Sequence, residues 1–177
     1  GVSEVYPLNI TMSYSAVANN GILNQPLAIN LIRDNNDLII KEFTSESVEV
    51  ADQKEIFILR DMMKSVIDNG TGGSLRWKYK FYAPMAGKTG TTNSKTDAWF
   101  IGFTPYIVIG IWVGMDDPQM KLGEKQYGSN AAMPIFADAI KEIYNLGNYY
   151  HLGKIVKINS KEDWEIPSGI VEKNICK

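Results

Sequence analysis

An almost uninterrupted apolar run from Ala98 to Met115 constrains the fold more than any other feature of this sequence. The run is close to the minimum length of about 17 residues for a membrane-spanning helix. However, Thr104-Pro105 stands at its middle, and its apolar residues are mostly aromatic or β-branched, which favours strands. We therefore expect two buried strands joined by a Thr-Pro turn, and not a transmembrane segment.

Three segments have the spacing of amphipathic helices. They cover residues 7–19, 52–68 and 131–146. Asp52 lies three residues before Glu55, a variant of the capping box, and Asn130 is the expected cap of the last helix, with Gly147 at its end. The side chains expected to face the core are Leu8, Met12, Val17, Ile56, Leu59, Met63, Val66, Ile135, Phe136, Ala139, Ile140 and Ile143.

Shorter segments have the pattern of strands. Residues 27–32 and 38–41 flank the polar sequence Asp34-Asn35-Asn36-Asp37, which predicts a hairpin, and residues 154–158 alternate like a short strand. The threonines of residues 87–92 favour a further strand. Residues 44–51 and 116–129 are expected to be polar connections, and residues 70–73, with three glycines, a loop.

Composition excludes several functional classes. The net charge is -2, from 18 basic and 20 acidic residues with no run or stripe of one sign, so nucleic acid is not an expected partner. The single cysteine, Cys176, and the single histidine, His151, are far apart in the sequence, which argues against a zinc or haem site. Cysteine poverty is compatible with either the cytosol or a bacterial exterior.

Gly87-Lys88-Thr89 first suggests a phosphate-binding loop. That loop requires a glycine five residues before Gly87, where this sequence has Tyr82, and it requires a helix immediately afterwards. Residues 90–93 instead have the pattern of a strand and turn, so nucleotide binding is rejected.

As part of a strand, Lys88-Thr89-Gly90 resembles the third motif of penicillin-binding proteins and serine β-lactamases. The residues around it widen the likeness to the class A, bifunctional penicillin-binding proteins, and this resemblance covers nearly the whole chain. The similar segments are residues 3–8, 18–21, 70–72, 86–93, 97–105, 111–117 and 132–136.

The resemblance implies that residues 1–177 are the C-terminal portion of a transpeptidase domain. The expected fold is α+β, an antiparallel sheet flanked by helices as in serine β-lactamases, incomplete in this chain. The implied function is part of a D,D-transpeptidase that cross-links peptidoglycan outside the cytoplasmic membrane. Its implied partners are stem peptides ending in D-alanyl-D-alanine, β-lactams and the upstream half of the domain, and it needs no metal or cofactor. An upstream glycosyltransferase domain and membrane anchor are also implied.

The family's chemistry assigns roles to four residues. Lys88 attracts the substrate's terminal carboxylate and helps poise the proton relay, while the hydroxyls of Thr89 and Thr91 bind that carboxylate. Gly90 lets the peptide lie against the strand, and the main-chain N–H of Thr91 contributes to an oxyanion hole. The aromatic residues nearby are expected to pack and the other cations to be solvated. The residues expected to have a structural or packing role are Asp97, Trp99, Trp112, Trp77, Tyr79 and Tyr82, and those expected to be solvated are Lys121, Lys125 and His151.

The sequence departs from the family at its nucleophile. No serine is followed by lysine three residues later, and Ser-x-Asn is also absent. Both motifs are expected upstream or on another chain, so this chain alone is predicted to be inactive. Two alternatives remain: a non-catalytic module that senses β-lactams or peptidoglycan, and a D,D-carboxypeptidase or β-lactamase relative.

Overall fold

The structure is a computed structural model that describes residues 5–117, 120–151, 154–171 and 173. Its helices are α1 (Pro7–Ala18), α2 (Gln53–Asp68), α3 (Ser74–Trp77), a π-helical turn η1 (Gly128–Ala132) and α4 (Met133–Leu146). Its strands are β1 (Ile22–Asn24), β2 (Leu31–Arg33), β3 (Ile39–Glu42), β4 (Ser47–Glu49), β5 (Ala86–Thr91), β6 (Asp97–Phe103), β7 (Val108–Gly114), β8 (Asn148–His151) and β9 (Lys154–Lys157).

A three-stranded antiparallel sheet in the order β5-β6-β7 forms the centre of the molecule. β6 and β7 are the two halves of the apolar run, and Thr104 closes the turn between them by donating its main-chain N–H to Ile107. The expectation of two strands is thus confirmed. Among the described residues, no helix combines the length and apolar character needed to cross a membrane.

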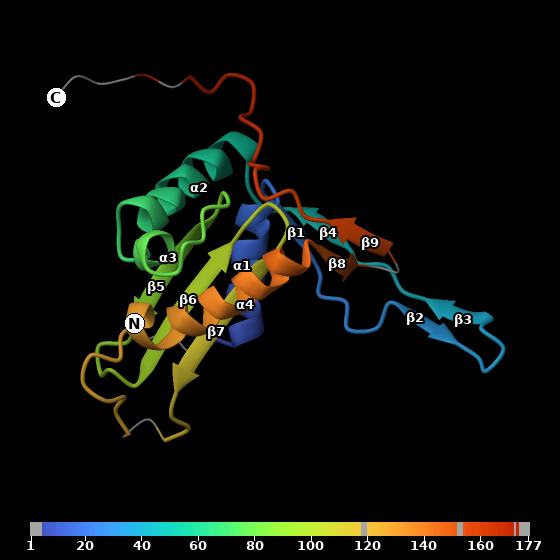
Figure 1. The fold of residues 1–177 in the computed structure, drawn as a ribbon. Helices are drawn as coiled ribbons and strands as arrows, with labels where there is room; N and C mark the ends of the chain where they lie inside the picture. Colours follow the sequence, from blue (N-terminus) through green and yellow to red (C-terminus); the bar gives the residue numbers. More distant parts are fainter. Residues whose placement is uncertain (1–4, 118–119, 152–153, 172, 174–177) are drawn as a thin grey trace.

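Helices cover both faces of this sheet (Figure 1). On one face, the Phe136 ring of α4 packs edge-on against Phe100, 4.8 Å between centroids. On the other, Tyr14 of α1 packs edge-on against Phe103 at 6.3 Å. Successive residues of a strand point to opposite sides of the sheet, so β6 supplies apolar side chains to both layers. The expected α+β fold, a sheet flanked by helices, is confirmed.

Helix α2 runs beside β5 and contributes side chains to the apolar clusters on both faces of the sheet. Asp52 caps it by accepting the main-chain N–H groups of Lys54 and Glu55, as the sequence predicts. The buried positions are Ile56, Arg60, Met63 and Ile67. The prediction for Leu59 is wrong, because it is 41% exposed. The helix turns the Ile56-to-Ile67 stripe inward, and Leu59 lies beside that stripe.

Two further core predictions are wrong. Leu8 is 57% exposed, and it lies in the first turn of α1, residues 7–9, which is exposed throughout. Ile135 is 51% exposed. The buried residues of α4 include Met133, Phe136 and Ile140, and at about 100° per residue Ile135 falls on the opposite side of the helix.

Of the two predictions for the ends of α4, one is confirmed and the other is wrong. Gly147 terminates the helix with φ 68°, in the left-handed region, as expected. Asn130 is not its cap, because η1 leads directly into the helix at Met133. The Asn130 side chain instead donates a hydrogen bond to the carbonyl of Lys125.

Three small antiparallel pairs lie to one side of the central sheet (Figure 1). β2 and β3 form the predicted hairpin, although the first strand begins only at Leu31, and β9 pairs with β8. Residues 44–51 were expected to be a polar connection between elements, but they contain β4, which pairs with β1. β4 is exposed and has a polar residue at each end, so its own sequence does not indicate a strand. It forms because it pairs with β1, which is distant in the sequence.

Candidate functional site

β5 carries the Lys-Thr-Gly sequence and lies at the edge of the central sheet, paired with β6 alone among the described strands. Ala86 and Gly87 at its beginning are buried, whereas Lys88 and Thr91 are exposed. A Cβ at Gly87 would lie 2.8 Å from the carbonyl oxygen of Ile101, so this glycine allows close packing. The strand thus begins in the core and ends at the surface.

The main-chain groups of alternate residues face the open edge of β5. In an antiparallel pair, hydrogen-bonded and non-hydrogen-bonded residue pairs alternate. The N–H of Thr92 bonds to the carbonyl of Asp97, so the next pair, Thr91 with Ala98, is non-hydrogen-bonded. The N–H and C=O of Thr91, and by the same alternation those of Thr89, therefore point away from β6.

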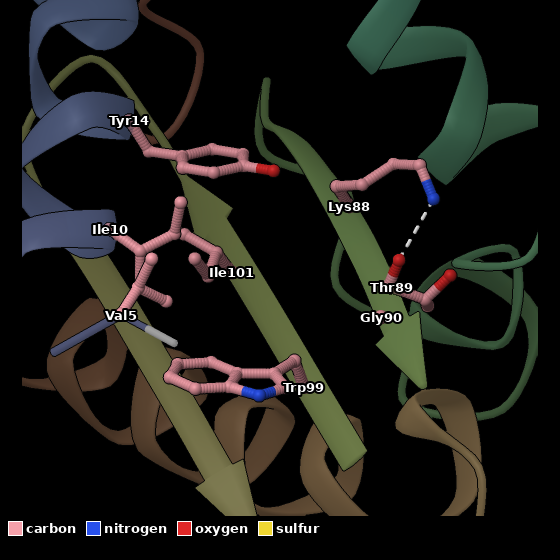
Figure 2. A pocket seen from close by; sticks show the side chains of 8 residues that line it. All are labelled: Val5, Ile10, Tyr14, Lys88, Thr89, Gly90, Trp99 and Ile101. Carbon is pink, nitrogen blue, oxygen red and sulfur yellow. Dashed lines mark hydrogen bonds between the residues drawn. The ribbon is translucent and has the colours of Figure 1, made fainter. Parts of the chain in front are cut away.

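The Lys88 ammonium lies at this same edge. Its Nζ donates a hydrogen bond to the main-chain carbonyl of Thr89, with the two atoms 2.8 Å apart (Figure 2). A carbonyl that points away from β6 is open to such a bond. The contact therefore agrees with the strand geometry and places a positive charge beside the outward-facing groups of β5.

A pocket of about 200 Å³ opens next to Lys88 on the α1 side of the sheet. Its other lining residues are Val5, Ile10, Tyr14, Thr89, Gly90, Trp99 and Ile101, so its walls are largely apolar. The ring of Tyr14 extends across the pocket toward Lys88 (Figure 2). Burial raises the pKa of the Tyr14 phenol above its ordinary value of 10.0.

Thr89 and Thr91 point to the opposite side of the strand from Lys88 and Gly90, because side chains alternate. Thr89 Oγ1 lies 2.9 Å from Thr71 Oγ1, in the loop that follows α2. Thr91 Oγ1 accepts a hydrogen bond from the main-chain N–H of Gly128 at 3.2 Å. Sequence reasoning missed both partners, although Gly70-Thr71-Gly72 was among the similar segments.

Gly128 approaches the sheet too closely for any side chain. A Cβ there would lie 2.3 Å from the carbonyl oxygen of Trp99 and 2.7 Å from that of Gly90. Contacts this short are not tolerated, so η1 can cover this end of β5 only with glycine at the position.

The turn after β5 is held by Asp97. Its carboxylate accepts hydrogen bonds from the Trp112 indole at 2.8 Å, from Thr96 at 2.7 Å and from Thr92 at 3.2 Å. Burial raises the pKa of Asp97, but the bonds from Thr96, Trp112 and Thr92 outweigh it and the pKa lies below its ordinary value. The structural role expected for Asp97 and Trp112 agrees with these contacts, but the expected burial of Trp112 is wrong, because its side chain is 40% exposed.

The predictions for the remaining residues are confirmed for some and wrong for others. Tyr79 packs against the core, but Trp77 and Tyr82 are 66% and 67% exposed, so the expectation that they pack is wrong. In the short helix α3, Leu75 fills the core and Trp77 is directed to solvent. Lys121, Lys125 and His151 are exposed. Cys176 lies outside the described residues, within which no cluster of three metal-ligating side chains occurs.

Comparison with known proteins gives one consistent family. Residues 1–141 match the sequence model of the penicillin binding protein transpeptidase domain. Penicillin-binding protein 1A of Aquifex aeolicus is 36% identical over 175 residues, which cover 99% of this chain and 22% of that protein. Penicillin-binding protein 1A of Rickettsia typhi is 37% identical over 167 residues, which cover 81% of this chain and 21% of that protein. The chain thus spans about a fifth of the length of these relatives.

Solved structures show the same fold. Penicillin-binding protein 1A from Haemophilus influenzae matches with a TM-score of 0.75 at 23% identity, covering 80% of this chain and 27% of that one. The D,D-transpeptidase domain of a peptidoglycan glycosyltransferase from Eggerthella lenta matches with a TM-score of 0.63 at 22% identity. The match covers 81% of this chain and 33% of that one.

Proposed function

Since this chain belongs to the penicillin-binding protein transpeptidase family, we propose that it supplies the substrate-binding strand of a D,D-transpeptidase. The observation that carries the proposal is the open edge of β5, where Lys88, Thr89 and Thr91 bring together a positive charge, two hydroxyls and main-chain groups that point away from β6. The substrate is a peptidoglycan stem peptide that ends in D-alanyl-D-alanine, and β-lactams bind at the same place.

The terminal carboxylate of the peptide is recognised by Lys88, Thr89 and Thr91. Lys88 attracts the anion, and its exposure means that water and salt screen this attraction. The threonine hydroxyls add direction, because a hydrogen bond to a charged group contributes about 1.5–3 kcal/mol. Recognition therefore depends on both charge and hydroxyl geometry.

The scissile carbonyl lies beside the main-chain N–H of Thr91. That N–H points away from β6 and can donate to the oxygen that becomes negative when the carbonyl is attacked. Gly90 has no side chain to obstruct an extended peptide that adds to the edge of the sheet. Loss of one comparable oxyanion donor in other enzymes lowers the rate by about 10²–10³.

The nucleophile comes from outside this sequence, since no Ser-x-x-Lys occurs in it. A serine hydroxyl attacks the carbonyl of the penultimate D-alanine, the terminal D-alanine leaves, and an amine of a second stem peptide then takes the acyl group. The open apolar walls of the pocket beside Lys88, among them Val5 and Trp99, support the proposal that the missing half of the domain packs there. Cross-linking takes place outside the cytoplasmic membrane, in a protein anchored by an upstream segment.

Fluorescent penicillin tests this function. The full-length polypeptide that carries this segment is expected to be labelled covalently, and the 177-residue chain alone is not. Lys88→Ala should slow labelling at least about tenfold, whereas Lys154→Ala, which removes an exposed lysine of β9, should leave it unchanged. Labelling of the isolated chain, or undiminished labelling of the Lys88→Ala protein, would contradict the proposal.

A further inference from the structure

A third threonine lies on the face of β5 that carries Thr89 and Thr91. Thr71, from the loop between α2 and α3, places its Oγ1 2.9 Å from Oγ1 of Thr89. Both residues of this hydrogen bond remain accessible to solvent, and Thr71 is exposed. The loop thus brings a hydroxyl to the substrate strand from 18 residues earlier in the sequence.

The loop is packed tightly enough to hold Thr71 in place. A Cβ at Gly70 would lie 2.9 Å from Cα of Val66, and a Cβ at Gly72 would lie 2.7 Å from Cδ1 of the buried Ile67. The N–H of Gly72 donates to the carbonyl of Val66 at 2.9 Å. Main-chain contacts on both sides of Thr71 therefore fix the loop on the end of α2.

The hydroxyls of Thr71, Thr89 and Thr91 retain hydrogen-bond donors that their mutual contacts do not use. In the Thr71–Thr89 pair one hydroxyl donates its hydrogen and the other accepts, so the accepting residue keeps a free O–H. Thr91 Oγ1 accepts from the N–H of Gly128, which leaves the Thr91 hydrogen free as well. Two O–H donors remain for a ligand, and a carboxylate has two oxygens to receive them.

From this geometry we infer that Thr71 is a further determinant of carboxylate recognition, a residue that the Lys-Thr-Gly strand requires but does not contain. It orients the Thr89 hydroxyl and exchanges the donor role with it when the anion binds. This inference rests on the proposed function, since it names the third hydroxyl of the same site. It makes the loop after α2 part of the specificity of the enzyme.

Acylation of the full-length polypeptide by benzylpenicillin and by its methyl ester tests the inference. Thr71→Val keeps the shape of the side chain and removes the hydroxyl. It should slow acylation by benzylpenicillin roughly tenfold and leave the slower reaction of the ester nearly unchanged. Thr71→Ser, which restores a hydroxyl, should react within about twofold of the wild type. Thr44→Val, a change at an exposed threonine in the connection after β3, is the matched control.

The outcomes separate the two proposals. Equal losses with the acid and the ester would show a merely structural role and overturn the inference, as would a Thr71→Val protein that reacts like the wild type. A wild-type protein that benzylpenicillin does not acylate at all would overturn the proposed function itself.

Discussion

The guanidinium of Arg60 lies 4.8 Å from the centroid of the Trp164 indole, which joins helix α2 to the C-terminal tail across more than a hundred residues. Arg60 is 1% exposed and donates to the carbonyl of Val17 and to Asn20 Oδ1, while Trp164 donates its indole N–H to the carbonyl of Ala18. Burial lowers the pKa of Arg60 to about 10, although the charge of Asp163 opposes it. The tail therefore completes the contact between α1 and α2.

Trp164→Ala should destabilise the chain by about 2–4 kcal/mol, because it removes an indole from both Arg60 and Phe103 and leaves the Ala18 carbonyl without its donor. Denaturant unfolding followed by circular dichroism measures the change. Trp77→Ala removes an indole that is 66% exposed and should shift stability by no more than about 0.5 kcal/mol. Similar losses from the two variants would rule out a specific role for the tail.

Gly128→Ala should destabilise the protein by about 1–3 kcal/mol and weaken the hold of η1 on Thr91. The new Cβ would collide with the carbonyl oxygens of Trp99 and Gly90, which cannot move without disturbing the sheet. Gly123→Ala is the matched control, since its Cβ would meet only the side chain of Gln126 at 3.7 Å. Thermal unfolding compares the two variants. Equal unfolding midpoints would show that η1 can shift to accommodate the new Cβ without loss of stability.

Asp97→Asn should cost about 1–2 kcal/mol at neutral pH, because hydrogen bonds from Trp112, Thr96 and Thr92 are weaker when the acceptor is uncharged. The folded carboxyl has a pKa below its ordinary value of 3.8. Its contribution to stability is therefore present above that value and is lost as the pH falls through the folded pKa.

Unfolding of the wild type and the Asp97→Asn protein between pH 7 and pH 2 measures this dependence. The difference in unfolding free energy should shrink as the pH falls below about 4. A difference that stays constant over that range would show that the charge of Asp97 contributes nothing to the turn.

Local sequence was sufficient wherever a pattern of neighbours decides the structure. The apolar run split at Thr104-Pro105 predicted β6 and β7, Asp52 predicted the start of α2, and Gly147 predicted the end of α4. The threonine-rich motif predicted the strand β5. Each of these signals lies within a few residues of the feature it specifies.

Tertiary contacts decided the rest. The sequence offered Ile135 and Phe136 equally to the core, and only the position of β6 selects Phe136. Neither the Thr71–Thr89 pair nor the bond from Gly128 to Thr91 follows from periodicity, because each joins segments that are distant along the chain. The sequence by itself determined that Lys88-Thr89-Gly90 lies on a strand, and folding determined which groups surround that strand, since spacing along a chain does not encode long-range proximity.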